Sequence, residues 1–267
     1  MPFSINSASP TIPNSASKTS AASFERLGSG SKINHAGDDA AGLAISQRIT
    51  TKLGGFDAAI RNSGDGISAI QVADGVLNSL TKNIGRIQEL ATQSANGTLN
   101  DKDRQALQAE ASQLVEESNR ILEQTNFNGK SLLSSDNDLN IQLEDPASNI
   151  NIKGKDLASE FESLGFNDID LSSQAGASAA LGILSDASES TISRASELGA
   201  ISNRLENSIE NLASSRVNSA EARSRITDTD FAKETADLAA SQVQNQVQIA
   251  IQSQANSQRD FVLQLLS

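Results

Sequence analysis

The chain has no Cys, Trp or Tyr, and Phe alone supplies the 3% of its 267 residues that are aromatic. The absence of cysteine excludes disulfide bonds, thiolate nucleophiles and cysteine metal ligands. With so few large rings, side chains such as Ala, Ser and Leu can fill the space between close helices but not the middle of a thick globule. The composition therefore predicts an elongated, mainly α molecule.

Runs of basic residues are missing as well. The 33 Asp and Glu outnumber the 21 Lys and Arg, which gives a formal net charge of -12. Nucleic-acid binding depends on clustered basic residues, so we expect no nucleic-acid partner. No segment approaches the roughly 18 consecutive apolar residues of a membrane-spanning helix, so we expect no membrane insertion. The first residues, MPFSINSASP, lack the basic and apolar regions of a secretory signal peptide, so we expect that the chain does not use a cleaved secretory signal.

What the chain does contain is long stretches in which small and apolar residues recur at spacings of three and four. This spacing places them on one face of a helix and defines a coiled-coil seam. The first seam comprises Ile70, Ala73, Leu77, Leu80, Ile84, Ile87 and Ala91. The second comprises Leu107, Ala111, Leu114, Ser118, Ile121 and Thr125. The third comprises Leu184, Ser188, Thr191, Ala195, Leu198, Ser202, Leu205, Ile209 and Leu212.

The boundaries of these helices are also readable. A turn at Asn96-Gly97 precedes Asn100, which is followed by acidic residues and should begin the second helix; Asn128-Gly129 should end it. Helices joined by so short a turn lie antiparallel. The sequence thus predicts an antiparallel coiled-coil bundle.

Two further segments complete the secondary structure. Residues 140–143 and 149–152 alternate polar and apolar side chains on either side of Glu144–Ser148, which predicts a small β-hairpin. The last segment, from Phe231, contains the strand-like VQNQVQIAIQ, but its length and its Ala and Gln content favour a helix.

The only histidine, His35, lies three and four residues before the carboxylates Asp38 and Asp39. Such a cluster can be a metal site, a catalytic site or the start of a helix. A metal site would need further ligands, and the chain has no second His and no Cys to supply them. We therefore expect Gly37 to turn the chain while both carboxylates cap a helix that begins near Ala40, each contributing about 0.3–1 kcal/mol.

Catalytic signatures are missing too. The chain has no HExxH, GxSxG, Walker or GxGxxG motif. The carboxylates of Glu116-Glu117 and Asp228–Asp230 could form an acid–base pair, but a solvated helix face and a helix cap explain them more simply. We expect no enzyme activity and no cofactor.

Several blocks of residues give a more specific indication. The N-terminal half of bacterial flagellin is similar, in order, to ERLGSGSKINHAGDDAAGLAISQRI, RNSGDGISAIQVADGVLNSL, GRIQELATQSANGT, RQALQAEASQLVEESNRI and QTNFNGKSLL. Its C-terminal half resembles LGAISNRLENSIENLASS, EARSRITDTDFAKETADLA and the closing segments QSQAN and VLQLL. Flagellins usually carry a larger middle insertion, so the chain resembles a short form with little or no outer domain.

The resemblance implies a domain organisation in which the two chain ends pair and form the inner tube of a filament. The parts would be an N-terminal arm of the inner core (1–39), N-terminal rod helices (40–133), a short variable segment with the hairpin (134–176), a C-terminal rod helix (177–226) and a C-terminal inner-core helix (227–267). Flagellins carry a Leu- and Asn-rich helical pattern at the N-terminus. Here Pro10 and Pro13 argue against a continuous helix before about Asn14.

The resemblance also implies a function: a structural subunit that self-assembles into the extracellular flagellar filament for motility, exported by the flagellar type III apparatus. Its partners would be other copies of the chain, an export chaperone, and the hook-associated and cap proteins. The alternatives are the hook–filament junction protein and a minor, specialised filament subunit.

Four residues match the surface that many flagellins present to the animal innate-immune flagellin receptor, namely Arg86, Leu90, Gln93 and Glu110. Spacings of four and three place the first three on one helical face. The same face is expected to be buried between subunits in the filament. We therefore expect it to serve in subunit packing and in receptor binding.

Overall fold

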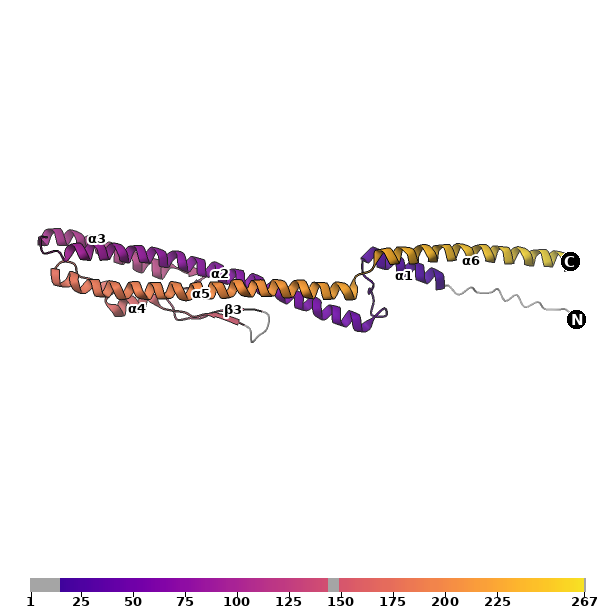
Figure 1. Cartoon of the computed structure of the whole chain (residues 1–267), viewed down its shortest axis with the longest axis horizontal. Helices are drawn as coiled ribbons and strands as arrows, with labels where there is room; N and C mark the ends of the chain where they lie inside the picture. The colour runs from indigo at the N-terminus through magenta and orange to yellow at the C-terminus, as the bar shows by residue number, and fades with distance from the viewer. Residues whose placement is uncertain (1–14, 144–148, 267) are drawn as a thin grey trace. The chain divides into compact units, whose positions relative to one another are not determined.

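The computed structural model describes residues 15–143 and 149–266, and it divides into two compact units. Of the described residues, those up to residue 53 and from residue 218 form unit 1, and those from residue 54 to residue 217 form unit 2. Helices dominate both units, and the β structure of the described residues consists of two short antiparallel hairpins and one isolated bridge (Figure 1). The prediction of a mainly α fold with a small hairpin is confirmed.

The elements have the following bounds. The helices are α1 (Ser15–Ser29), α2 (Ala40–Ser94), α3 (Asp101–Gln124), α4 (Leu157–Leu164), the 3-10 helix η1 (Phe166–Asp168), α5 (Gln174–Thr227) and α6 (Phe231–Leu266). The strands are β1 (Asn126–Phe127), β2 (Lys130–Ser131), β3 (Leu139–Gln142) and β4 (Asn149–Ile152). Helices α2 and α5 run from one unit into the other.

The heptad seams form the core of unit 2. Every residue of the first seam, from Ile70 to Ala91, is at most 5% exposed. The buried residues of the second and third seams belong to α3 and α5, and α2, α3 and α5 lie side by side (Figure 1). The seams predicted from the sequence are confirmed, because small and apolar side chains at these spacings interdigitate at native packing density.

Helix α3 begins where the sequence predicts. The side chain of Asn100 accepts a hydrogen bond from the backbone N–H of Asp103 (3.0 Å), and the Asp103 carboxylate accepts one from the N–H of Asn100 (3.4 Å). This reciprocal pair is a capping box, which satisfies two N–H groups that the helix itself leaves unpaired.

The end of α3 differs from the prediction. The helix ends at Gln124 rather than at Asn128-Gly129, and the next residues form the β1–β2 hairpin. Asn128 (φ 51°) and Gly129 (φ 78°) are its two turn residues, and both have the positive φ that a type I′ turn requires. The Asn-Gly pair therefore turns a hairpin instead of ending a helix.

The β3–β4 hairpin is present as predicted, although its turn, residues 144–148, lies outside the described residues. Ile141 pairs with Ile150 across the strands, and both side chains are buried. Ile141 packs onto α2 at Gly66, where a Cβ atom would lie only 3.1 Å from Ile141 Cγ1. The absence of a side chain at Gly66 lets the hairpin approach the helix.

The sequence did not reveal α4 and η1, which follow the β3–β4 hairpin. They bury Phe161 and Phe166, whose ring centroids are 4.9 Å apart. These two rings are among the few aromatic side chains of the chain, and both belong to the hydrophobic core of unit 2.

Unit 1 contains an antiparallel pair of helices, α1 and α6. The amide of Asn245 donates a hydrogen bond to Ser20 Oγ (3.1 Å), and Arg26 pairs with Glu234 at 3.8 Å. The predicted C-terminal helix and the predicted pairing of the two ends are therefore present. The expectation about Pro10, Pro13 and the start at Asn14 concerns residues outside the described part of the chain.

Candidate assembly surfaces

Hydrogen bonds join the connection between α1 and α2 to the connection between α5 and α6. The backbone N–H of Lys32 donates to the carbonyl of Thr227 (2.7 Å), and the N–H of Thr229 donates to the carbonyl of Gly30 (3.0 Å). Ser31 Oγ also donates to the Thr227 carbonyl (3.0 Å). We call residues 30–39 and 227–230 the joint. Its hydrogen bonds fix which part of α1 lies beside which part of α6.

Asp39 lies at the start of α2 and has the geometry of a helix cap. Its carboxylate accepts a hydrogen bond from the N–H of Gly42 (2.8 Å), and its carbonyl accepts one from Leu43 (2.9 Å). A Cβ atom at Gly42 would overlap the Asp39 carboxylate and would lie 2.8 Å from Ile33 Cδ1. Glycine at this position therefore lets the cap and the Ile33 side chain pack on the first turn of the helix.

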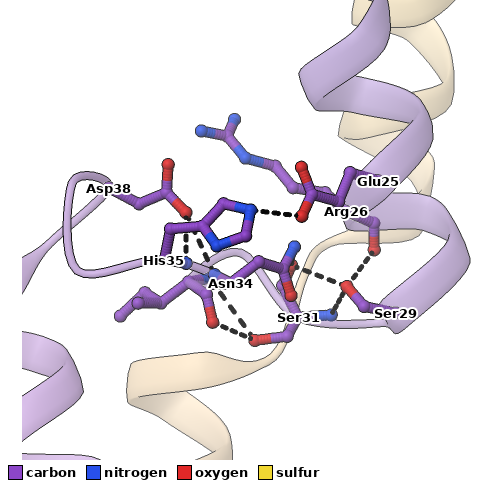
Figure 2. A network of polar contacts seen from close by, with 8 residues as sticks. Glu25, Arg26, Ser29, Ser31, Asn34, His35 and Asp38 are labelled. Atoms are coloured by element: carbon purple, nitrogen blue, oxygen red, sulfur yellow. Dashed lines mark hydrogen bonds and ion pairs between the residues drawn. The ribbon is translucent and has the colours of Figure 1, made fainter.

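Asp38 has a different role from the helix cap that the sequence suggested. Its carboxylate accepts hydrogen bonds from the N–H groups of His35 (2.9 Å) and Asn34 (3.0 Å), both of which precede it (Figure 2). These two hydrogen bonds, His35 first, hold the pKa of the Asp38 carboxyl below its ordinary value. Asp38 thus closes the turn before α2, because Gly37 folds the chain back and brings these amides nearer to it than those of the helix.

His35 points toward α1 rather than toward the carboxylates that follow it. Its Nε2 lies 2.7 Å from Glu25 Oε1, on the last turns of α1 (Figure 2). In the part of the chain that the structure describes, no group of three or more His, Cys, Asp or Glu side chains is arranged to hold a metal ion. The sequence offered no signal for the Glu25 contact, because it depends on how α1 meets the joint.

Arg86 and Glu110, two of the residues matched to the receptor surface, are in direct contact. Arg86 Nε donates to Glu110 Oε1 (2.9 Å), which links α2 to α3, and a second guanidinium nitrogen lies 2.9 Å from Glu89. The hydrogen bonds to Glu110 and then Glu89 raise the pKa of Arg86. Gln93 is exposed on the same helix. Sequence matching did not find Glu89.

Leu90 does not share this surface. It is 1% exposed and belongs to the hydrophobic core of unit 2. The spacing from Arg86 is correct, but Leu90 lies next to Ile87 and Ala91 of the first seam, so its side chain turns inward toward the other helices. The expectation that Leu90 is available to a receptor or to a neighbouring subunit is corrected accordingly.

Unit 1 contrasts with this well-packed unit. Among its described residues, the one buried apolar side chain is Ile33, and the other buried side chains are the polar Ser23, Ser46, Glu234 and Ser241. Large apolar side chains are instead exposed to between 48% and 70%: Phe24, Ile45, Phe231, Val243, Val247, Ile249, Ile251, Phe261 and Val262. Isolated exposed apolar residues are common, but a concentration of them marks an interaction surface.

Charge divides between the units in the same way. Unit 1 contains equal numbers of acidic and basic residues, so the whole net charge of -12 lies between residues 54 and 217. Neutral surfaces can approach closely, whereas strongly acidic ones repel one another in water. Unit 1 therefore has the charge and the apolar surface of a part that packs densely. None of the described helices is long and apolar enough to span a bilayer.

Known proteins of one family are similar to this chain over most of its length. The family model of the bacterial flagellin N-terminal helical region matches residues 4–138, and that of the bacterial flagellin C-terminal helical region matches residues 181–266. The chain is 40% identical to a flagellin of Halalkalibacterium halodurans, over 91% of this chain and 90% of that protein. It is 37% identical to a flagellin of Bacillus subtilis, over 91% of each. The crystal structure of Bacillus cereus flagellin aligns with a TM-score of 0.52 and 31% identity, over 57% of this chain and 88% of that one. The chain belongs to the bacterial flagellin family.

Proposed function

We propose that this flagellin polymerises through the exposed apolar side chains of unit 1. The chain is a structural subunit of the bacterial flagellar filament, and we infer no catalytic role for it. The observation that carries the proposal is the contrast within unit 1, where Ile33 is buried and large side chains such as Phe24 and Val243 are exposed. A pair of helices that buries so little needs a further surface to pack against.

The energy available from this surface is substantial. Complete burial of a Val, Ile or Phe side chain contributes about 1.5–3 kcal/mol. Val243, Val247 and Ile251 are each at least half exposed, so contact with another copy can supply roughly half of that amount per side chain. Over the eight exposed large apolar side chains of α1 and α6, these contributions amount to about 6–12 kcal/mol, which is comparable with the cost of about 4–15 kcal/mol of bringing two copies together.

We further propose the layer to which each part of the chain belongs. The ends of the chain, residues 1–39 and 227–267, carry 8 acidic and 5 basic residues and form the inner core of the filament. The helices of residues 40–133 and 177–226 form the surrounding rod, and residues 134–176 form a short outward segment with the hairpin. The acidic excess of unit 2 supports this arrangement, because charges of one sign repel least where water and ions separate them. The filament is extracellular.

The exposed face of α6 also bears on partners. Before assembly, apolar side chains such as Val247 and Ile251 would be open to water, so we propose that an export chaperone covers the C-terminal segment until type III export. Hook-associated and cap proteins would contact the same segment at the filament ends. Arg86, Gln93 and Glu110 are retained as a proposed packing and receptor surface, without Leu90.

The alternatives named from the sequence have less support. The relatives described above are flagellins, which favours the filament subunit over the hook–filament junction protein. A minor, specialised filament subunit would polymerise through the same surfaces.

The proposal is tested by electron microscopy of the purified chain seeded with filament fragments. The variant with Val243, Val247 and Ile251 all changed to Ser should fail to extend the seeds. The matched control changes three exposed apolar residues of unit 2, Val72, Ile192 and Val217, to Ser, and it should extend them. Equal extension by both triple variants would refute the proposed surface. Failure of the unmodified chain to form filaments would refute the filament function.

A further inference from the structure

Helix α6 presents two chemically different faces. The residues that are buried or half-buried beside α1 are Glu234, Leu238, Ser241, Asn245 and Gln248. They recur at spacings of four and three, which defines the face toward α1. Val243, Val247 and Ile251 recur every four residues, and all three are exposed. At about 100° per residue, they lie on the opposite side of the helix.

We call Val243, Val247 and Ile251 the α6 stripe. Its position reverses the usual arrangement, in which the larger apolar side chains of a helix face its partner. Here mostly polar and small residues face α1, and the larger apolar ones face away. The helix is therefore built to contact a second surface that the α1–α6 pair itself does not supply.

A second apolar patch lies on a different side of the α1–α6 pair. Phe24 of α1 and Phe231 of α6 are both more than half exposed. The ring of Phe231 lies 3.8 Å from where a Cβ of Gly30 would be, so it is seated against the joint. Because α1 and α6 are antiparallel, a helical projection at about 100° per residue places both rings on one flank of the pair, away from the α6 stripe. We call these two residues the phenylalanine patch.

We infer that the α6 stripe of one copy packs against the phenylalanine patch of the next copy. This inference rests on the proposed function and specifies which surfaces meet. Two different patches on different sides of one subunit make a head-to-tail contact, which can repeat without limit. Pairing of the stripe with itself would instead close a dimer and leave both rings in water. Since unit 1 is neutral overall, no net repulsion opposes the contact.

Cysteine cross-linking tests the pairing directly, because the natural chain has no Cys. Two full-length variants, Val247→Cys and Phe24→Cys, are mixed in equal amounts, polymerised on seeds and oxidised. We expect a cross-linked dimer in the mixture at a yield several-fold above that of either variant alone, and only under polymerising conditions. Each chain carries one Cys, so every cross-link joins two copies.

The matched control is Gln246→Cys mixed with Phe24→Cys, because Gln246 is exposed on α6 beside the stripe. Filaments in which the Val247 mixture cross-links no better than this control would overturn the inference. So would filaments in which Val247→Cys cross-links chiefly with itself. Both results leave the filament function intact, whereas a wild-type chain that forms no filaments would refute that function.

If the cysteine variants polymerise poorly, a charge-complementation experiment tests the same pairing. Val247→Glu and Phe24→Lys should each lower the extent of polymerisation at least several-fold when alone. Mixed in equal amounts, they should recover most of it, since the introduced carboxylate of one variant then meets the introduced ammonium group of the other and the remaining contacts are natural. No recovery in the mixture would overturn the pairing. The unfolding temperature of each variant, compared with that of the natural chain, serves as the folding check.

Discussion

Leu90→Ala is the most informative single substitution, because it separates a surface role of this residue from a role in the core. Leu90 is 1% exposed and packs within the cluster that includes Ile87 and Ala91. Truncation of such a side chain removes its burial and leaves a cavity, which costs about 2.7–5 kcal/mol. For a unit of this size that loss lowers the unfolding temperature by roughly 5 to 20 °C.

The assay is thermal unfolding of the unpolymerised chain, followed by circular dichroism at the helix band. Gln93→Ala is the matched control, since Gln93 is exposed one turn further along the same helix. The control should change the free energy of unfolding by no more than about 0.5 kcal/mol. If Leu90→Ala left the unfolding temperature within about 2 °C of the control, well short of the loss expected for a buried leucine, the assignment of Leu90 to the core would be untenable, and its place on the surface would have to be restored.

Three further predictions concern the caps and the joint. Asn100→Ala removes the capping box of α3 and should cost about 1 kcal/mol, measured by urea unfolding; an unchanged midpoint would contradict the cap. Gly42→Ala should speed proteolysis at the joint, because the added Cβ would overlap the Asp39 carboxylate. Its control is Gly75→Ala, where nothing lies within 4 Å and where the substitution should stabilise α2 by up to about 1 kcal/mol. Equal proteolysis rates for the two variants would refute the close packing at Gly42. The pKa of Asp38 is lowered from 3.8, so the contribution of Asp38 is present above that value and is lost as the pH falls through the lower folded pKa. Asp38→Asn should therefore speed hydrogen exchange of the Asn34 and His35 amides at neutral pH, and should remove the acid-induced loss of their protection. Exchange that is unchanged by the substitution would contradict the two hydrogen bonds to Asp38.

The long-range repeats were the most predictable part of the fold. The seam from Ile70 to Ala91 has one small or apolar residue at each step, so periodicity alone located the core of unit 2. Asn100 and the acidic residues after it predicted the start of α3, because a helix cap joins residues that are close in the sequence. By contrast, α4 has 8 residues, about two turns, which is too few for a helical spacing of apolar residues to be recognised in the sequence.

The candidate surfaces were harder to predict, for two physical reasons. Spacing placed Leu90 on the same side of the helix as Arg86, but it could not say where that side meets the neighbouring helices. Asp38 differs from Asp39 only in which amides the turn brings near its carboxylate. The α6 stripe could have been predicted from the sequence, because a helical projection of the segment VQNQVQIAIQ aligns Val243, Val247 and Ile251.

The central claim is that the helices of unit 1 complete their packing only against other copies of the chain. Amide hydrogen exchange, read segment by segment in the unpolymerised chain and in filaments, tests it most directly. The account predicts that α1 and α6 exchange rapidly in the unpolymerised chain and are protected in filaments, while the seam from Ile70 to Ala91 is equally protected in both. Protection of α1 and α6 that is already complete before polymerisation would contradict the claim.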